Sequence, residues 1–282
     1  ADLADLSAEL RARPAVRDSL IGIGVAVVGV VRRSDGLVAM APNLDWHDVA
    51  LGERLAQVFG TDVPISVAND ADLGAIAELR RGAAIGGDNV LFISGEVGVG
   101  GGLIVDGRPL TGAAGYGGEV GHMPINPNGT ACHCGSTGCW ETEIGANALL
   151  RRAGHRADGS RSEIETVVRE AVDGSPVALA AFASVGHWLG FGLAGLINVL
   201  NPRLVVLGGL FGRIHPFVIT ALREELARRA MPATLKLVRV VPASLGMEAP
   251  LLGAAELAFE PMLSDPAIRL RQRDAMTELA SA

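Results

Sequence analysis

Two kinds of apolar pattern alternate along the 282-residue chain. Short β-branched runs bounded by charges and glycines predict buried strands, and longer stretches with apolar residues three or four apart predict helices. Strands are expected at residues 21–31, 37–41, 63–68, 89–93, 100–105, 204–207 and 237–241. Helices are expected at residues 2–13, 48–59, 71–81, 146–152, 161–173, 176–200, 216–229 and from 253 onward. This alternation predicts a mixed α/β protein whose sheets are covered by helices.

Composition places the chain in the globular class, with 49% hydrophobic and 20% charged residues. The longest apolar runs, such as residues 20–31, are too short or too rich in glycine to span a bilayer, and no membrane partner is expected. No signal-peptide pattern marks export, so we expect a cytoplasmic protein. The net charge of −7 argues against direct binding to nucleic-acid phosphates. Because the first residue is Ala1, we expect a fragment or a trimmed chain.

All three cysteines lie in one glycine-rich stretch, residues 118–143, together with a well-spaced histidine. The spacing is H-x9-C-x-C-x4-C, made by His122, Cys132, Cys134 and Cys139. Thiolates and imidazole are the ligands of structural zinc, which closes a tetrahedral shell of four protein groups. In small peptides such a set binds zinc with an apparent free energy of roughly 10–16 kcal/mol, enough to hold a loop with almost no core. A structural zinc loop is therefore predicted, with His133 as the competing imidazole.

Two other interpretations of the cysteines stay open. The thiols can be small buried hydrophobic side chains beside a core histidine, although their polar, glycine-rich surroundings disfavour this. A nucleic-acid zinc knuckle uses similar ligands, but basic and aromatic residues are not clustered nearby.

Carboxylates and an amide flank the zinc loop and follow an apolar strand. Asn69-Asp70 comes directly after the strand predicted at residues 63–68, where an ordinary helix N-cap would also explain the aspartate. Glu119 and Glu141 stand near the two ends of the loop, and each alone would be a solvated surface charge. Together these groups suit a sugar, because carboxylates accept hydrogen bonds from adjacent hydroxyls while asparagine both donates and accepts.

The run GEVGHMPINPNGTACHCGSTGCWE resembles the signature of the ROK family of repressors, uncharacterised reading frames and sugar kinases. The resemblance extends through VANDADLGAIAE, GVGGGLIVDGRPLTGAAG and NPRLVVLGG, and covers most of residues 20–260. It implies an actin-like (ribonuclease H-like) sugar kinase fold with two α/β domains and a cleft between them. The domains are expected at residues 1–86, joined by a C-terminal helix at 265–282, and at residues 87–264.

The resemblance also implies roles for particular residues. Zinc would be held by His122, Cys132, Cys134 and Cys139. A sugar would be held by Asn69, Asp70, Glu119, His122 and Glu141, with Asn43 as a weaker candidate. In the family's kinases Asp70 would be the general base that takes a proton from the attacking sugar hydroxyl.

The phosphate side departs from the kinase pattern. Where kinases read GTGIGGG, residues 96–102 read EVGVGGG, so Glu96 replaces a glycine and Val97 replaces the threonine. Gly98, Gly100 and Gly101 remain as positions of a degenerate phosphate loop. The Asp-x-Gly hairpin that kinases use for phosphates and magnesium does not precede residue 20. ATP and magnesium are therefore expected only if the chain is a kinase.

These departures favour the repressor branch of the family. We predict the effector domain of a sugar-responsive transcriptional regulator, binding a hexose or amino sugar in the cleft and without catalytic activity. Family regulators bind DNA through an N-terminal helix-turn-helix, which these residues lack, and family members are commonly dimers or tetramers. The alternative is an ATP-dependent hexose or N-acetylhexosamine kinase. A third interpretation is a zinc-stabilised structural module without a ligand.

Overall fold

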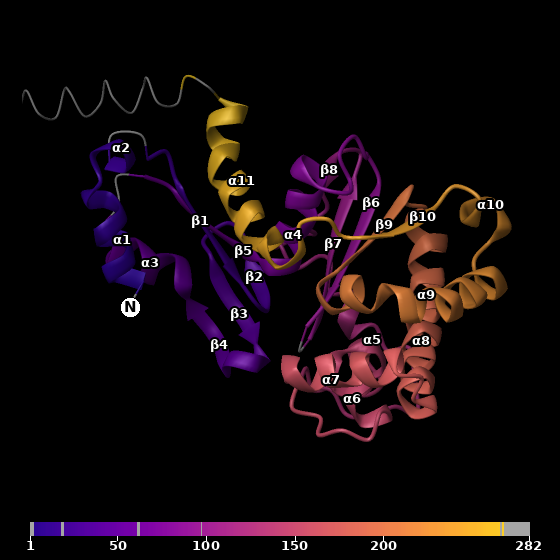
Figure 1. Ribbon diagram of the computed structural model, residues 1–282. Helices are drawn as coiled ribbons and strands as arrows, with labels where there is room; N and C mark the ends of the chain where they lie inside the picture. Colours follow the sequence, from indigo (N-terminus) through magenta and orange to yellow (C-terminus); the bar gives the residue numbers. More distant parts are fainter. Residues whose placement is uncertain (1–2, 18–19, 61–62, 97, 266, 268–282) are drawn as a thin grey trace, which may run out of the picture. The chain divides into compact units, whose positions relative to one another are not determined.

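The computed structural model describes residues 3–17, 20–60, 63–96, 98–265 and 267. The chain divides into two compact units. Unit 1 comprises Ala1–Asn69 and Leu251–Ala282, and unit 2 comprises Asp70–Pro250. Figure 1 labels the helices and strands of both units. Sheets and helices occur in each, which confirms the predicted mixed α/β class.

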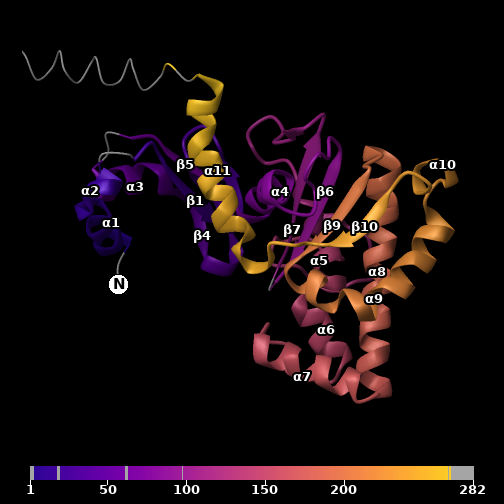
Figure 2. The same cartoon turned by 45° about the horizontal axis from the view of Figure 1, so that its top comes forward.

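Unit 1 contains two small sheets. In the parallel sheet β1 (Ile23–Val27) pairs with β5 (Ile65–Asn69), and in the antiparallel sheet β3 (Leu37–Ala41) lies between β2 (Val30–Arg32) and β4 (Trp46–Ala50). The other elements are α1 (Leu3–Ala12), α2 (Pro14–Arg17), η1 (Pro42–Leu44), α3 (Leu51–Phe59) and most of α11 (Ala249–Ser264). Figure 2 shows α11 beside β1 and β5, where the backbone of Ala254 meets Gly24.

Two sequence-based expectations in unit 1 are wrong. Residues 21–31 form two strands rather than one, because Gly29 adopts a left-handed conformation (φ +98°) and bends the chain between β1 and β2. Residues 48–50 belong to β4 rather than to a helix, because Val49 and Ala50 pair with β3 across the sheet. Helix α3 therefore begins at Leu51.

Unit 2 is built on a five-stranded mixed sheet with the order β10-β9-β6-β7-β8. The strands are β6 (Val90–Gly95), β7 (Val99–Val105), β8 (Arg108–Pro109), β9 (Leu204–Gly208) and β10 (Arg239–Pro242). β6 pairs antiparallel with β7 and parallel with β9. Successive β6 side chains point to opposite faces. Leu91 and Ile93 enter one apolar core, whereas Val90 and Phe92 enter another.

Helices cover both faces of this sheet. α4 (Asp70–Arg81) packs on the face of Phe92, while α8 (Pro176–Leu200) and α9 (Gly209–Arg229) run side by side on the opposite face (Figure 1). The remaining elements are η2 (Val120–His122), α5 (Trp140–Ile144), α6 (Ala146–Arg152), α7 (Arg161–Val172), α10 (Pro232–Leu235) and η3 (Gly246–Glu248). Among the described residues, α8 alone is long and apolar enough to cross a membrane, and 56% of the stretch concerned is buried inside the protein.

Helix α9 is longer than its sequence suggests. The expected start at Pro216 is wrong, because the helix begins at Gly209 and keeps Pro216 inside it. A proline inside a helix removes one backbone hydrogen bond, but Leu210 and Ile214 are fully buried and hold the preceding turns in the core. The earlier start brings Arg213 into the second turn of the helix.

The structure groups α4 with unit 2 because this helix packs closely against β7. Side chains on Gly100 and Gly102 of β7 would collide with Ala71 and Ala75 of α4. The domain limits expected from the sequence, residues 86 and 264, stay a prediction. The helix expected at residues 265–282 lies, apart from residues 265 and 267, outside the described part of the chain.

Candidate functional site

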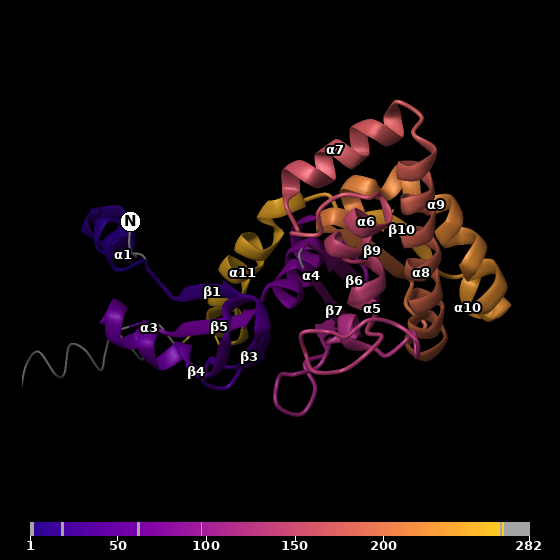
Figure 3. The same ribbon diagram turned by 90° about the horizontal axis from the view of Figure 1, so that it is seen from below.

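The loop at residues 118–139 is held by its own backbone. Ile125 and Asn126 both donate to Gly138 O, and Cys132 N donates to Ser136 O at 2.8 Å. The following residue, Trp140, is fully buried and its Nε1 donates to Trp188 O on α8 at 2.8 Å. Figure 3 shows this magenta loop next to β7 and α5. The loop is thus fixed at its end by one aromatic anchor and internally by short-range hydrogen bonds.

The structure brings together the four residues that the sequence predicts as zinc ligands. One donor atom from each of His122, Cys132, Cys134 and Cys139 lies within 4.8 Å of all the others. Cys132 Sγ is 3.7 Å from His122 Nδ1, and Cys134 Sγ is 3.6 Å from Cys139 Sγ. A tetrahedron with Zn–S bonds of ~2.3 Å has edges of ~3.8 Å. The spacing therefore fits a tetrahedral divalent ion.

Two of the buried thiols would need a nearby cation to ionise and act as ligands. Burial raises the pKa of the Cys132 thiol to about 12, and burial also raises the pKa of Cys139 above its ordinary value. A bound cation supplies the positive charge that stabilises the thiolate form. His133 is exposed and is not part of the cluster, so the structure separates it from His122. The identity of the ion as zinc stays a prediction.

Two glutamates lie beside the cluster, one near His122 and one near Cys132. His122 turns Nδ1 toward Cys132 and Nε2 toward Glu119, whose Oε2 is 3.9 Å away. Glu141 Oε1 lies 3.8 Å from Cys132 Sγ, while its Oε2 accepts a hydrogen bond from Val99 N at 2.9 Å. The loop at residues 118–139 and the start of β7 are therefore connected through one carboxylate.

Asp70 belongs to the same acidic neighbourhood. It is the first residue of α4, and its Oδ1 accepts a hydrogen bond from Ala71 N at 3.0 Å. Burial raises the pKa of Asp70, and the charge of Glu96 raises it further. Burial likewise raises the pKa of Glu119, with the charges of Asp70 and Glu141 adding to the effect and that of His122 opposing it. These carboxylates are close enough to influence one another and are well suited to accept hydrogen bonds from hydroxyl groups.

The two asparagines of the predicted sugar site belong to unit 1. Asn69 is the last residue of β5, and its Nδ2 donates to Gly29 O at 2.9 Å. Asn43 is exposed in η1. Asp70, Glu119, His122 and Glu141 therefore belong to unit 2, whereas Asn43 and Asn69 belong to unit 1. Their roles toward a sugar stay predictions.

The glycines that the sequence assigns to a degenerate phosphate loop have a role in packing. Gly98 lies in the turn between β6 and β7, and Val97 lies outside the described residues. Gly100 and Gly101 belong to β7, where side chains would collide with Ala71 on one face and with Val120 on the other. Close packing of α4 and η2 therefore requires glycine at both positions, whether or not a phosphate binds.

Sequence reasoning missed one partner of Glu96. Its Oε2 lies 3.5 Å from Nη2 of Arg213. The signal was present, because Arg213 follows the pair Gly208-Gly209 by one helical turn, but the expected helix start at Pro216 concealed it.

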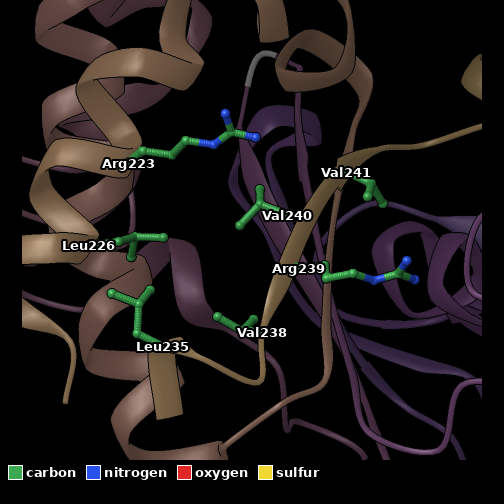
Figure 4. Close-up of a pocket in the computed structure, with 7 residues that line it drawn as sticks. All are labelled: Arg223, Leu226, Leu235, Val238, Arg239, Val240 and Val241. Atoms are coloured by element: carbon green, nitrogen blue, oxygen red, sulfur yellow. The ribbon is translucent and has the colours of Figure 1, made fainter. Parts of the chain in front are cut away.

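A separate cavity of about 490 Å³ lies elsewhere in unit 2, between α9 and β10. Figure 4 shows Leu226 on the helix side and Val238 and Val240 on the strand side, with Arg223 and Arg239 beside them. None of the predicted site residues lines this cavity. The candidate site is therefore defined by polar side chains rather than by this apolar space.

Comparison with known proteins gives relatives of two kinds. The profile of the ROK family matches residues 5–260. A xylose repressor from Bacillus subtilis is 32% identical over 244 residues, which are 86% of this chain and 62% of the repressor. The chain thus spans less than two thirds of that relative's length.

Two similar solved structures are one regulator and one kinase. A ROK family transcriptional regulator, described as a homologue of the E. coli MLC protein, gives a TM-score of 0.77 at 29% identity, covering 91% of this chain and 67% of the regulator. A ROK family glucokinase from Streptomyces griseus, solved with glucose and AMPPNP, gives 0.78 at 32% identity and covers 92% and 88%. Similarity therefore supports a sugar-related protein with this fold and does not separate regulator from kinase.

Proposed function

Because the chain belongs to the ROK family, with its actin-like sugar kinase fold, we propose that it is the sugar-sensing effector part of a transcriptional regulator. The ligand is a hexose, a pentose or an amino sugar. Binding to DNA would require a helix-turn-helix segment outside the 282 residues. The acting form is a homodimer or homotetramer.

The sugar would be bound by the carboxylates beside the metal loop. Asp70, Glu119 and Glu141 supply acceptors for neighbouring hydroxyl groups. His122 contributes its Nε2 edge, which faces Glu119, while its Nδ1 edge faces the thiols. Asn69, which precedes Asp70 in the chain, would add an amide donor. The xylose repressor and the glucose-bound glucokinase among its relatives support a monosaccharide as the ligand class.

Zinc would make the sugar site rigid rather than take part in chemistry. A closed shell of His122 and three cysteines leaves no open position for a substrate. Zinc would also fix the ring of His122. A bond from Nδ1 to the metal would set the direction in which Nε2 points. Loss of the ion would therefore weaken sugar binding as well as stability.

The carboxylate of Glu96 is the observation that favours a regulator over a kinase. It stands at the turn between β6 and β7, close enough to Asp70 for its charge to raise that residue's pKa. Two like charges 4 Å apart repel by about 4 kcal/mol at an effective dielectric of 20. The repulsion is smaller here, because the Glu96 side chain is 54% exposed. A phosphate placed beside Glu96 would still meet an unfavourable charge.

A sugar kinase is the second candidate, and Asp70 favours it. A general base works best when its pKa lies near the operating pH, and burial moves the pKa of Asp70 in that direction. In this case the substrate would be a hexose or N-acetylhexosamine, with ATP and magnesium as co-reactants.

A coupled assay of ADP formation with a panel of monosaccharides separates the two candidates. We expect no sugar-dependent ADP release from the wild-type chain at millimolar ATP and magnesium. Sustained turnover that is lost in Asp70→Asn would establish the kinase and refute the regulator.

A further inference from the structure

An acidic side chain from the β6–β7 turn lies at the start of helix α9. Gly209, the first residue of α9, forms an isolated parallel bridge with Gly95, the neighbour of Glu96. A side chain on Gly209 would lie 2.8 Å from Glu96 Oε1. The other oxygen, Oε2, is 3.5 Å from Nη2 of Arg213. The carboxylate of Glu96 therefore lies against both the first turn of α9 and a guanidinium group in its second turn.

This end of α9 favours a negative charge for two independent reasons. The first N–H groups of a helix lack intrahelical acceptors and, with the helix dipole, carry about half a positive charge. In the described residues no side chain caps α9, and its first turn contains no acid. Arg213 adds a full positive charge, with 30% of its side chain exposed. Glu96 is the acid that the fold brings to this position from another element.

One further hydrogen bond holds the backbone of this turn. Ala146 N, in the first turn of α6, donates to the backbone oxygen of Glu96 at 3.4 Å. A helix N-terminus, here that of α9, and an arginine are each groups that bind phosphate in proteins. The surroundings of Glu96 thus have the chemistry of an anion site, and the anion is part of the chain.

We propose that Glu96 is a built-in anion, whose carboxylate occupies an anion-binding position made by Arg213 and the N-terminus of α9 and so takes the place of a ligand phosphate. The inference rests on the proposed function, since a sugar sensor has no need of a nucleotide. Glu96 is then a specificity-determining residue that keeps phosphate compounds away from the sugar-binding carboxylates. Removing its side chain leaves Arg213 and the helix start open to phosphate.

Equilibrium dialysis of ATP and, separately, of inorganic pyrophosphate tests this on the 282-residue chain. The variants are wild type, Glu96→Ala, Glu96→Gln and the double variant Glu96→Ala/Arg213→Ala. Glu224→Ala is the matched control, because it removes an exposed acid from the same helix. We expect Glu96→Ala to bind ATP at least about tenfold more tightly than wild type or the control, and the double variant to lose this gain.

The two probes and the glutamine variant define the site more closely. An equal gain for pyrophosphate shows that phosphate alone is recognised, whereas a gain for ATP only shows that the nucleoside contributes, and both results support the proposal. If Glu96→Gln also binds phosphate more tightly, the charge of Glu96 excludes phosphate. If only Glu96→Ala gains phosphate affinity, the volume of the Glu96 side chain excludes it. Unchanged affinity in Glu96→Ala, including no binding by either protein, overturns the proposal, as does a gain that persists without Arg213.

Sugar-dependent thermal stabilisation and ADP formation are measured on the same samples. If wild type is stabilised by sugar without turnover while Glu96→Ala gains no phosphate affinity, the inference about Glu96 fails and the regulator stands. If wild type phosphorylates the sugar, the proposed function itself is refuted.

Discussion

The carboxylate of Glu141 accepts a hydrogen bond from the backbone N–H of Val99 at 2.9 Å, while its other oxygen lies 3.8 Å from the sulfur of Cys132. One side chain therefore connects the start of β7 with the loop that carries the cysteines. Because Val99 is buried, its N–H would lose this acceptor in a place with little room for water.

Replacing Glu141 separates its structural role from its role toward a sugar. Glu141→Ala should lower the free energy of unfolding by about 1–3 kcal/mol, the cost of an unsatisfied buried donor. Glu141→Gln keeps an oxygen acceptor and should be nearly as stable as wild type, but it should bind sugar at least about tenfold more weakly. Urea unfolding and sugar titration measure the two effects, and equal stability of Glu141→Ala and wild type would contradict the assigned contact.

The thiol cluster predicts one zinc ion per chain. Elemental analysis of Cys139→Ser should show loss of the ion, and its melting temperature should fall by at least about 5 °C. His133→Ala is the matched control, because His133 lies between two predicted ligands but is exposed. Full retention of stability after the ion is removed with a chelator would show that the cluster has no structural role.

Asp70 predicts a stability difference that depends on pH. Its folded pKa is raised above the ordinary value of 3.8, chiefly by burial, so the folded protein disfavours the ionised form. As pH rises from 3.8 through the raised folded pKa of Asp70, the wild type should lose more stability than Asp70→Asn, which lacks this carboxyl. The asparagine oxygen can still accept from Ala71 N, so the variant should melt higher than wild type at pH 7 and equally near pH 3.

Melting curves of Asp70→Asn and wild type between pH 3 and 8 measure this difference. The exposed Asp173→Asn serves as the matched control. A melting temperature of Asp70→Asn below that of wild type at pH 7 would contradict the claim that burial disfavours the charge of Asp70.

His155 also contributes stability that is lost as pH rises, but in a higher pH range than Asp70 and with a variant that is less stable than wild type. Its Nδ1 lies 2.8 Å from Glu163 and its Nε2 lies 3.1 Å from Glu170, and these hydrogen bonds raise its pKa above 6.5. The stabilisation is complete below 6.5 and is lost as pH rises through the raised folded pKa. Because both carboxylates are partly exposed, His155→Gln should cost about 0.5–1 kcal/mol at pH 6 and less at pH 9. His47→Gln, an exposed position, is the control; a cost that does not change with pH would refute the charged bridge.

The sequence predicted most of the architecture because its strongest signals are local. The 25-residue helix α8 has the limits expected from its apolar spacing and from Pro176 at its start. Local signals failed where tertiary packing decides. Gly29 divides one apolar run into two strands through a positive φ, and the buried residues of α9 carry that helix through Pro216.

The same limit applies to the candidate site. The spacing of His122 and the cysteines identified the cluster, because ligand spacing is written in the sequence. Neither the Val99–Glu141 hydrogen bond nor the Glu96–Arg213 pair follows from spacing, since each joins residues far apart in the chain. Only the folded sheet and its helices bring these partners together.

Isothermal titration of the zinc-loaded chain with monosaccharides, in the absence of nucleotide, tests the central claim most directly. Glucose, xylose and N-acetylglucosamine are suitable first ligands. We predict saturable binding of one sugar per chain, weakened at least about tenfold by Asp70→Ala and by Glu119→Gln, and unchanged in Glu224→Ala. No binding of any sugar, or binding that is the same in Asp70→Ala, Glu119→Gln and wild type, would contradict a sugar site at these carboxylates.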